Sequence, residues 1–221
     1  MRKETYITPS TLDQKCCEWM DAIADCNFRE RELRPDRAAL VVVDMQRFFL
    51  DEDQPLACEN SRVVIPRVRR LLDAFRSAGR PVIFLQNMHK GPGVDRSEQL
   101  CEFWPDAPLE GTPEVEIHPD LAPRPDEKVI PKRRYGGFHG TDLDLTLRVM
   151  KAEDLVICGV ITNVCPETTA RTAFMHDYRV FFTADATATL TEEMHVASLR
   201  TLAGWFAKVV TVADVESALA G

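Results

Sequence analysis

A cysteine stands where a buried strand would pass into a helix. Cys165 lies in DLVICGVITNVCPETT, residues 154–169, whose apolar strand-like run is broken at Gly159. Thr162 or Asn163 can then cap the helix that follows. Unpaired N–H groups at a helix start favour a thiolate, the species that attacks a carbonyl carbon. We therefore predict a nucleophile; the alternative is a cysteine that only packs in the core.

A carboxylate and a lysine follow two other apolar runs. Asp44 ends the strand pattern in AALVVVDMQRFF, residues 38–49, at the edge where open α/β sheets place their chemistry. Lys132 ends a short strand pattern in KVIPKRRYGGFHGTDLD, residues 128–144. Alone, Asp44 could cap a turn and Lys132 could be a solvated loop residue. Together with a cysteine, a carboxylate can move the thiol proton and a lysine can hold both groups ionised.

The order Asp44, Lys132, Cys165 resembles the catalytic triad of the isochorismatase-like cysteine hydrolases. The resemblance runs from about Pro35 to Val212 and is carried by VVVDMQ, KRRYGGF and GVITNVC, which end at Gln46, Phe138 and Cys165. This superfamily includes nicotinamidases, N-carbamoylsarcosine amidase, ureidoacrylate amidohydrolases and the isochorismatases proper. The resemblance implies a cysteine-dependent hydrolase that cleaves a C–N bond of a small amide, carbamoyl or ureido substrate through a thioester acyl-enzyme.

The mechanism implied by the resemblance uses few groups. Asp44 accepts the Cys165 proton during attack, protonates the leaving nitrogen and then activates the water that hydrolyses the thioester. Backbone N–H groups of Ile161 and Cys165 would form the oxyanion hole, and the Val160–Ile161 peptide would be cis.

The surrounding pattern predicts an α/β fold in three layers, α-β-α. Strand-like runs are expected near residues 40–43, 82–85, 128–131, 155–158, 180–183 and 209–212, and helices near 61–78, 141–150, 164–177 and 191–206. Alternation of the two types indicates a Rossmann-like, mostly parallel six-stranded sheet. The resemblance implies the strand order 3-2-1-4-5-6, which brings Asp44 and Cys165 together across the central crevice.

Substrate-binding residues are expected in the motifs and in the long connection 86–127. They are Gln46, Phe49, Gln86, Asn87, Arg96, Trp104, Arg134, Tyr135, Phe138 and Thr162. An arginine among them would suit a carboxylate on the substrate, although each arginine could equally pair with a surface acid.

No metal and no other cofactor is expected. Nicotinamidases of the superfamily hold zinc through an Asp-x-His motif and a further histidine. The matching stretch here is Asn87-Met88-His89, and Val94 stands where the second histidine would be. A catalytic zinc needs three protein ligands, so the sequence argues against zinc and, with it, against nicotinamide.

Composition limits the partners. With 27 basic and 35 acidic residues the net charge is −8, which argues against nucleic acid and anionic membranes. No run approaches the roughly 18 apolar residues of a membrane span, and the first residues lack the apolar core of a secretory signal. Seven cysteines without a C-x-x-C pair fit a reducing compartment, so we expect a cytoplasmic protein that acts on a small molecule.

The predicted domains are an N-terminal helical extension, residues 1–34, and a hydrolase domain, residues 35–221. Leu12, Cys16, Trp19 and Ile23 form one helical stripe in the extension. The stripe could pack against its own domain or form a subunit contact. From the second possibility and the resemblance we expect a homo-oligomer, either a dimer or a tetramer.

Two other functions remain open at this point. Glu98 to Trp104 resembles the isochorismatase branch, which would favour a vinyl ether hydrolase, but isochorismatases proper typically carry glycine where this chain has Cys165. A non-catalytic binding or assembly module would be expected to lack an intact triad.

Overall fold

The computed structural model describes residues 2–221 and contains one parallel six-stranded sheet in the order β3-β2-β1-β4-β5-β6. The strands are β1 (Ala38–Val43), β2 (Val82–Asn87), β3 (Lys128–Lys132), β4 (Asp154–Val160), β5 (Arg179–Ala188) and β6 (Ala207–Val210). β1 and β4, at the centre, are buried along their whole length. The predicted fold class and strand order are therefore confirmed.

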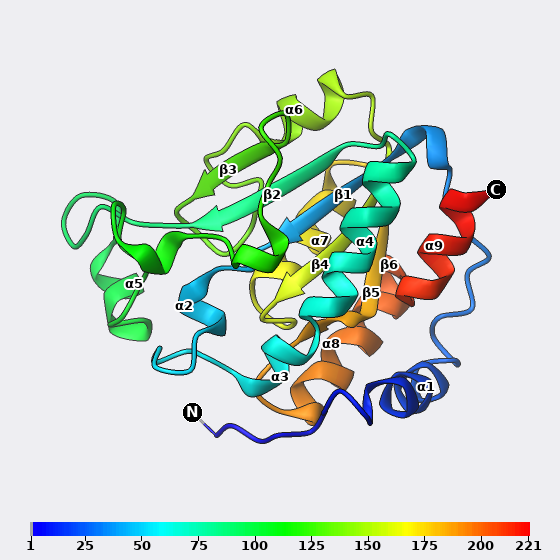
Figure 1. Cartoon of the computed structure of the whole chain (residues 1–221), viewed down its shortest axis with the longest axis horizontal. Helices are drawn as coiled ribbons and strands as arrows, with labels where there is room; N and C mark the ends of the chain where they lie inside the picture. The colour runs from blue at the N-terminus through cyan, green and yellow to red at the C-terminus, as the bar shows by residue number, and fades with distance from the viewer. Residues whose placement is uncertain (1) are drawn as a thin grey trace.

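Helices cover both faces of the sheet (Figure 1). They are α1 (Leu12–Ala22), α2 (Arg47–Leu50), α3 (Glu59–Val63), α4 (Ile65–Ser77), α5 (Glu98–Phe103), α6 (Leu143–Val149), α7 (Cys165–Met175), α8 (Glu192–Trp205) and α9 (Val212–Ala220). α4 and α9 pack together on one face, and α7 and α8 pack on the other. Because both faces are covered, apolar residues fill both sides of the central strands.

The central strands approach one another closely at the end that carries Asp44. Val43 of β1 is paired with Gly159 of β4, and Gly159 has a φ of +111°. A Cβ atom there would lie 2.0 Å from the carbonyl oxygen of Val43, so only glycine fits. The expectation that Gly159 ends the strand is wrong, because β4 continues through a register shift to Val160.

Several predicted boundaries differ from the structure. The helix expected over 61–78 is divided at Val64, because Pro66 fits the first turn of α4 but could not stand in the interior of one continuous helix. The last strand ends at Val210, and Val212 belongs to α9, whose start is fixed by the Thr211 capping box. Helices α2, α5 and α9 were not predicted; α2 and α5 are too short to show a helical period.

The N-terminal stripe packs against its own chain. Trp19 is 2% exposed, and Leu12, Cys16 and Ile23 are buried in the same hydrophobic core as the sheet. α1 contacts β5 and α8. Residues 2–34 of the predicted extension are described by the structure. The first strand of the sheet begins after them, at Ala38, but their buried side chains already belong to the hydrophobic core. The stripe cannot also be a subunit contact, and the expected oligomer loses that support.

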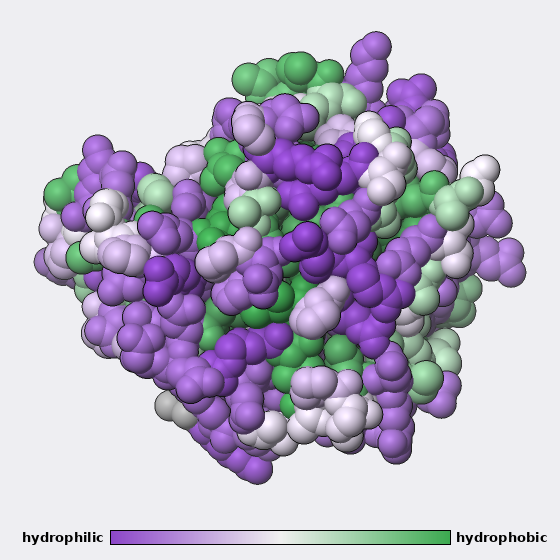
Figure 2. Space-filling model, in the orientation of Figure 1, coloured by the Kyte–Doolittle hydropathy of each residue, from purple (hydrophilic) through white to green (hydrophobic). Residues whose placement is uncertain are grey.

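Hydrophilic residues cover most of the face shown in Figure 2, and hydrophobic ones are visible mainly in hollows between them. Leu145 and Val149 of α6 are exceptions, at 66% and 74% exposure. Within residues 2–221, no helix has both the length and the apolar character needed to cross a membrane.

Candidate active site

Asp44 and Lys132 meet although their strands are not neighbours. Asp44 directly follows β1 and has a φ of +52°, a strained conformation for a residue with a side chain. Lys132 is the last residue of β3, two strands away. Its Nζ lies 2.9 Å from Oδ2 of Asp44 and donates to the carbonyl oxygen of Arg134 at 3.1 Å. Both side chains are completely buried, so this ion pair is shielded from water.

Cys165 is the first residue of α7 and lies beside the pair. Its thiol is close enough to interact with both Asp44 and Lys132. The residue before the helix is Val164, which offers no side-chain cap; Thr162 and Asn163, expected as caps, form other hydrogen bonds. The side chain of Cys165 therefore stands at an uncapped helix start, turned toward the ion pair.

Burial sets the protonation of the thiol. Burial raises the pKa of Cys165 above its usual range, and the Lys132 charge opposes this only in part. The expectation that the helix start and Lys132 would hold a resting thiolate is therefore wrong. The thiol keeps its proton until a neighbouring base removes it.

Asp44 is suited to be that base. Burial raises the pKa of Asp44, while the attraction of Lys132 works in the opposite direction. Burial by itself would lower the pKa of Lys132, but its interactions with Asp44 and Cys165 outweigh burial and the pKa is raised. We conclude that Lys132 stays protonated, and that Asp44 binds a proton more readily than an exposed carboxylate would.

Two backbone amides beside the thiol are free to bind an anion. Among residues 2–221, no backbone carbonyl accepts a hydrogen bond from the N–H of Ile161 or of Cys165. The Val160–Ile161 peptide is cis. These amides can serve as the two donors of an oxyanion hole.

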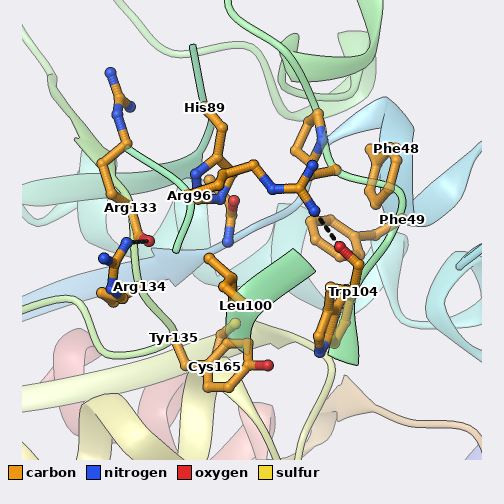
Figure 3. Close-up of a pocket in the computed structure, with 13 residues that line it drawn as sticks. Phe48, Phe49, His89, Arg96, Leu100, Trp104, Arg133, Arg134, Tyr135 and Cys165 are labelled. Atoms are coloured by element: carbon orange, nitrogen blue, oxygen red, sulfur yellow. Dashed lines mark hydrogen bonds between the residues drawn. The ribbon is translucent and has the colours of Figure 1, made fainter. Parts of the chain in front are cut away.

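A narrow cavity, partly open to solvent, leads to Cys165 (Figure 3). Six residues expected to bind substrate line it, namely Phe49, Asn87, Arg96, Trp104, Arg134 and Tyr135. Arg96 extends across the cavity toward the Trp104 carbonyl, and Cys165 lies on the opposite side. The side chains leave about 20 Å³ of open space, room for about one water molecule, which favours a small substrate.

Four expected substrate residues lie outside this lining. The buried Gln46 side chain binds the backbone of Asn87 and donates to the Val115 carbonyl at 2.9 Å, and Gln86 donates to the same carbonyl at 2.7 Å. Phe138 stacks on His176 with ring centroids 5.0 Å apart. The Thr162 hydroxyl shares a hydrogen bond with His195.

The sequence reasoning missed other residues of the lining. They are Phe48, His89, Leu100, Ala107 and Pro108; Arg133, beside the predicted Arg134 in the cationic loop, lines the cavity as well. His89, a lone histidine on a polar loop, is by its sequence more often a surface or pocket residue than a metal ligand, and Phe48 directly precedes a residue that was predicted. Leu100, Ala107 and Pro108 lie in the long connection 86–127. That segment has no hydrophobic periodicity that would show which of its side chains turn inward.

The arginines of the cavity differ in their partners. Arg133 is paired with Asp95 at 2.7 Å. Arg96 is 6% exposed and donates to the carbonyl oxygens of Trp104 and Pro105, and no acidic side chain within the described chain lies within 4 Å of it. The cavity wall therefore carries a buried positive charge without a protein counter-charge, which favours an anionic group on the ligand.

His89 contributes no charge to the cavity at neutral pH. It is 4% exposed, and burial lowers its pKa to about 4. In residues 2–221, no group of three or more His, Cys, Asp or Glu side chains is arranged to hold a metal ion.

Comparison with known proteins identifies the family. Residues 38–214 match the Isochorismatase domain model. The chain is 35% identical to "Nicotinamidase 3" of Arabidopsis thaliana over 198 residues, covering 87% of this chain and 94% of the relative. It is 31% identical to the ureidoacrylate amidohydrolase RutB of Rhizobium rhizogenes, covering 80% and 82%. The chain therefore belongs to the isochorismatase family, which confirms the resemblance stated above.

Solved structures agree with this assignment. A cysteine hydrolase from Pseudomonas syringae pv. phaseolicola superimposes with a TM-score of 0.82 at 31% identity, covering 86% of this chain and 96% of that one. The relatives thus include amidohydrolases and a cysteine hydrolase.

Proposed function

We propose that this protein is a cysteine amidohydrolase that cleaves the C–N bond of a small amide, carbamoyl or ureido compound carrying a carboxylate. The observation that carries the proposal is the buried contact of Asp44, Lys132 and Cys165 at a small cavity with an uncompensated arginine. Amidohydrolases among the relatives support the reaction class.

The first half of the reaction forms a thioester. Cys165 Sγ attacks the carbonyl carbon as its proton passes to Asp44, and the N–H groups of Ile161 and Cys165 stabilise the oxyanion. Asp44 then gives the proton to the leaving nitrogen, the C–N bond breaks, and ammonia or an amine departs. Lys132 remains charged throughout and stabilises the Asp44 carboxylate whenever that group is ionised.

The second half hydrolyses the thioester. Asp44, again ionised, takes a proton from a water molecule that attacks the acyl carbon, and the same amides bind the second oxyanion. Collapse of this intermediate releases the acid, and the proton returns to the Cys165 sulfur. The active site is restored with the same proton count.

Ammonia release tests the proposal. Wild type, Cys165→Ala and Cys158→Ala would be assayed with nicotinamide, maleamate, ureidoacrylate, N-carbamoyl amino acids and biuret. Cys158 is the matched control, because it is also a buried thiol but does not line the cavity. Release by wild type and Cys158→Ala alone is expected; release by Cys165→Ala at the wild-type rate would refute the mechanism.

Arg96 tests the substrate class. Arg96→Gln removes the charge and should raise KM for a carboxylated substrate about 10–100-fold, the loss of a charge-assisted hydrogen bond. Arg96→Lys keeps the charge and should retain part of the affinity. Equal KM changes for neutral and carboxylated amides would remove the carboxylate from the proposal.

Nicotinamide is the second candidate substrate. The 35% identical relative is named a nicotinamidase, and Phe48, Phe49 and Trp104 give the cavity aromatic walls. This reading predicts that the neutral ring amide is the best substrate of the panel and that Arg96→Gln leaves its KM unchanged.

A further inference from the structure

The short loop before the nucleophile is held by groups outside the cavity. This nucleophile loop, residues 161–165, joins β4 to α7 and carries both proposed oxyanion donors. Its backbone is fixed to the end of β5 by a hydrogen bond of 2.9 Å from the Thr162 N–H to the Ala188 carbonyl. The helix itself supplies no side-chain cap, so the position of the loop depends on its other side-chain contacts.

The first contact runs through a buried histidine. Thr162 Oγ1 lies 3.0 Å from Nδ1 of His195, a completely buried residue of α8. Burial lowers the pKa of His195 to about 3, so the ring is neutral. Its ring centroid is 4.4 Å from that of Trp19, and Trp19 Nε1 donates to Glu192 at 2.8 Å. The α1 tryptophan thus covers and fixes the ring that holds Thr162.

The second contact runs through a tyrosine near the start of the chain. The Tyr6 hydroxyl accepts a 3.0 Å hydrogen bond from the backbone N–H of Thr189. The Thr189 hydroxyl donates to Oδ1 of Asn163 at 2.6 Å. Asn163 lies two residues before Cys165, so a shift of Thr189 would be transmitted to the nucleophile loop.

We propose that the N-terminal segment, residues 2–23, is a positioning element of the active site. Tyr6 and Trp19 act on the nucleophile loop through Thr189 and His195, and neither touches the cavity. This inference rests on Cys165 being the nucleophile, as proposed above. The segment lies before residue 38, where the match to the family domain begins.

The geometry explains why such support matters. The attacking sulfur and two backbone donors must all face one carbonyl group, and a displacement of about 1 Å can lower the rate about 100-fold. The start of α7 has no side-chain cap, so the side-chain contacts of Thr162 and Asn163 help to fix the loop. The buried Trp19 ring belongs to the hydrophobic core and the half-buried Tyr6 ring packs against it, so both contacts start from a rigid layer.

Two measurements on point variants test the proposal. Tyr6→Phe and His195→Leu each remove one contact, and His195→Asn retains a side-chain amide that can bind Thr162. Hydrogen–deuterium exchange of the 160–168 peptide reports the loop without any substrate, and kcat and KM for the ammonia-releasing substrate report the chemistry. His195→Leu should speed loop exchange and lower kcat about tenfold or more with KM changed less than about threefold. Tyr6→Phe should do the same more weakly, and His195→Asn should recover part of kcat.

Asn27→Ala is the matched control. Asn27 binds the N–H and carbonyl of Val209 at 3.0 and 2.9 Å and anchors the chain far from the nucleophile loop. This variant should lower Tm while leaving loop exchange and kcat unchanged. Exchange that rises uniformly through the chain with a normal kcat in His195→Leu would overturn the proposal, as would unchanged loop exchange. If no panel substrate is hydrolysed, hydrogen–deuterium exchange of the 160–168 peptide still tests whether the N-terminal segment stabilises the nucleophile loop.

Discussion

Lys132→Met should leave a buried carboxylate without its partner. The methionine has similar length but no charge, and Asp44 would remain completely buried. Removing one partner of a buried ion pair typically costs about 3–5 kcal/mol, a large part of the roughly 5–15 kcal/mol by which a domain is stable. With a urea slope of about 2 kcal/mol per molar, the unfolding midpoint should fall by about 2 M at pH 8.

The loss should depend on pH in a defined direction. In the variant, burial without Lys132 raises the folded-state pKa of Asp44 further above its unfolded value. Between those two pKa values the folded state binds more protons than the unfolded state, so stability falls by about 1.4 kcal/mol for each unit that pH rises. The variant should therefore be less destabilised at pH 5.5 than at pH 8, by at least about 1 kcal/mol.

Urea unfolding of wild type, Lys132→Met and the double variant Asp44→Asn/Lys132→Met at both pH values is the assay. The double variant contains no unpaired buried charge and should recover most of the stability at pH 8. The same loss at both pH values, or no recovery in the double variant, would refute the assignment of a buried ion pair.

Four further predictions concern the site and its frame. Gly159→Ala should lower the free energy of unfolding by about 3 kcal/mol or more, measured by urea unfolding, because the new Cβ would overlap the Val43 carbonyl; stability within 1 kcal/mol of wild type would contradict the close approach. In the pH profile of kcat/KM, the acid limb should lie above the ordinary pKa of an aspartate, about 4, because burial raises the pKa of Asp44. His89→Gln should leave that profile unchanged between pH 6 and 8, because the His89 ring is already neutral there; a shifted limb would assign the proton transfer to the histidine. Gln46→Ala should cost about 1–3 kcal/mol in thermal or urea unfolding, because it leaves buried backbone groups unpaired; an unchanged midpoint would argue against that support.

The sequence predicted the strands of the sheet because their signals are local. Each central strand is a short run of small and β-branched residues, and Asp44 and Cys165 stand directly beyond two of them. The strand order follows from the family resemblance, and that order alone brings their carboxyl ends together. Lys132 could be placed in the same site because its side chain is long enough to reach Asp44 across the intervening strand.

Tertiary contacts decided what the sequence could not show. Gln46 is adjacent to Asp44 in sequence, but its amide binds the backbone of Asn87 and not the cavity. The sequence predicts Thr162 as a helix cap or a substrate contact, but in the structure its hydroxyl binds His195, which lies 33 residues later in the chain. Burial of the Cys165 thiol, which reverses the expected pKa shift, depends on the whole fold.

The most direct test of the account is a search for the acyl-enzyme. Wild-type protein would be mixed with its best panel substrate and quenched in acid during turnover. After digestion, the mass of the peptide containing Cys165 would be measured by mass spectrometry. The account predicts a mass increase equal to the acyl group on that peptide, absent from Cys165→Ala. Turnover in which the peptide stays unmodified, together with ammonia release by Cys165→Ala, would contradict it.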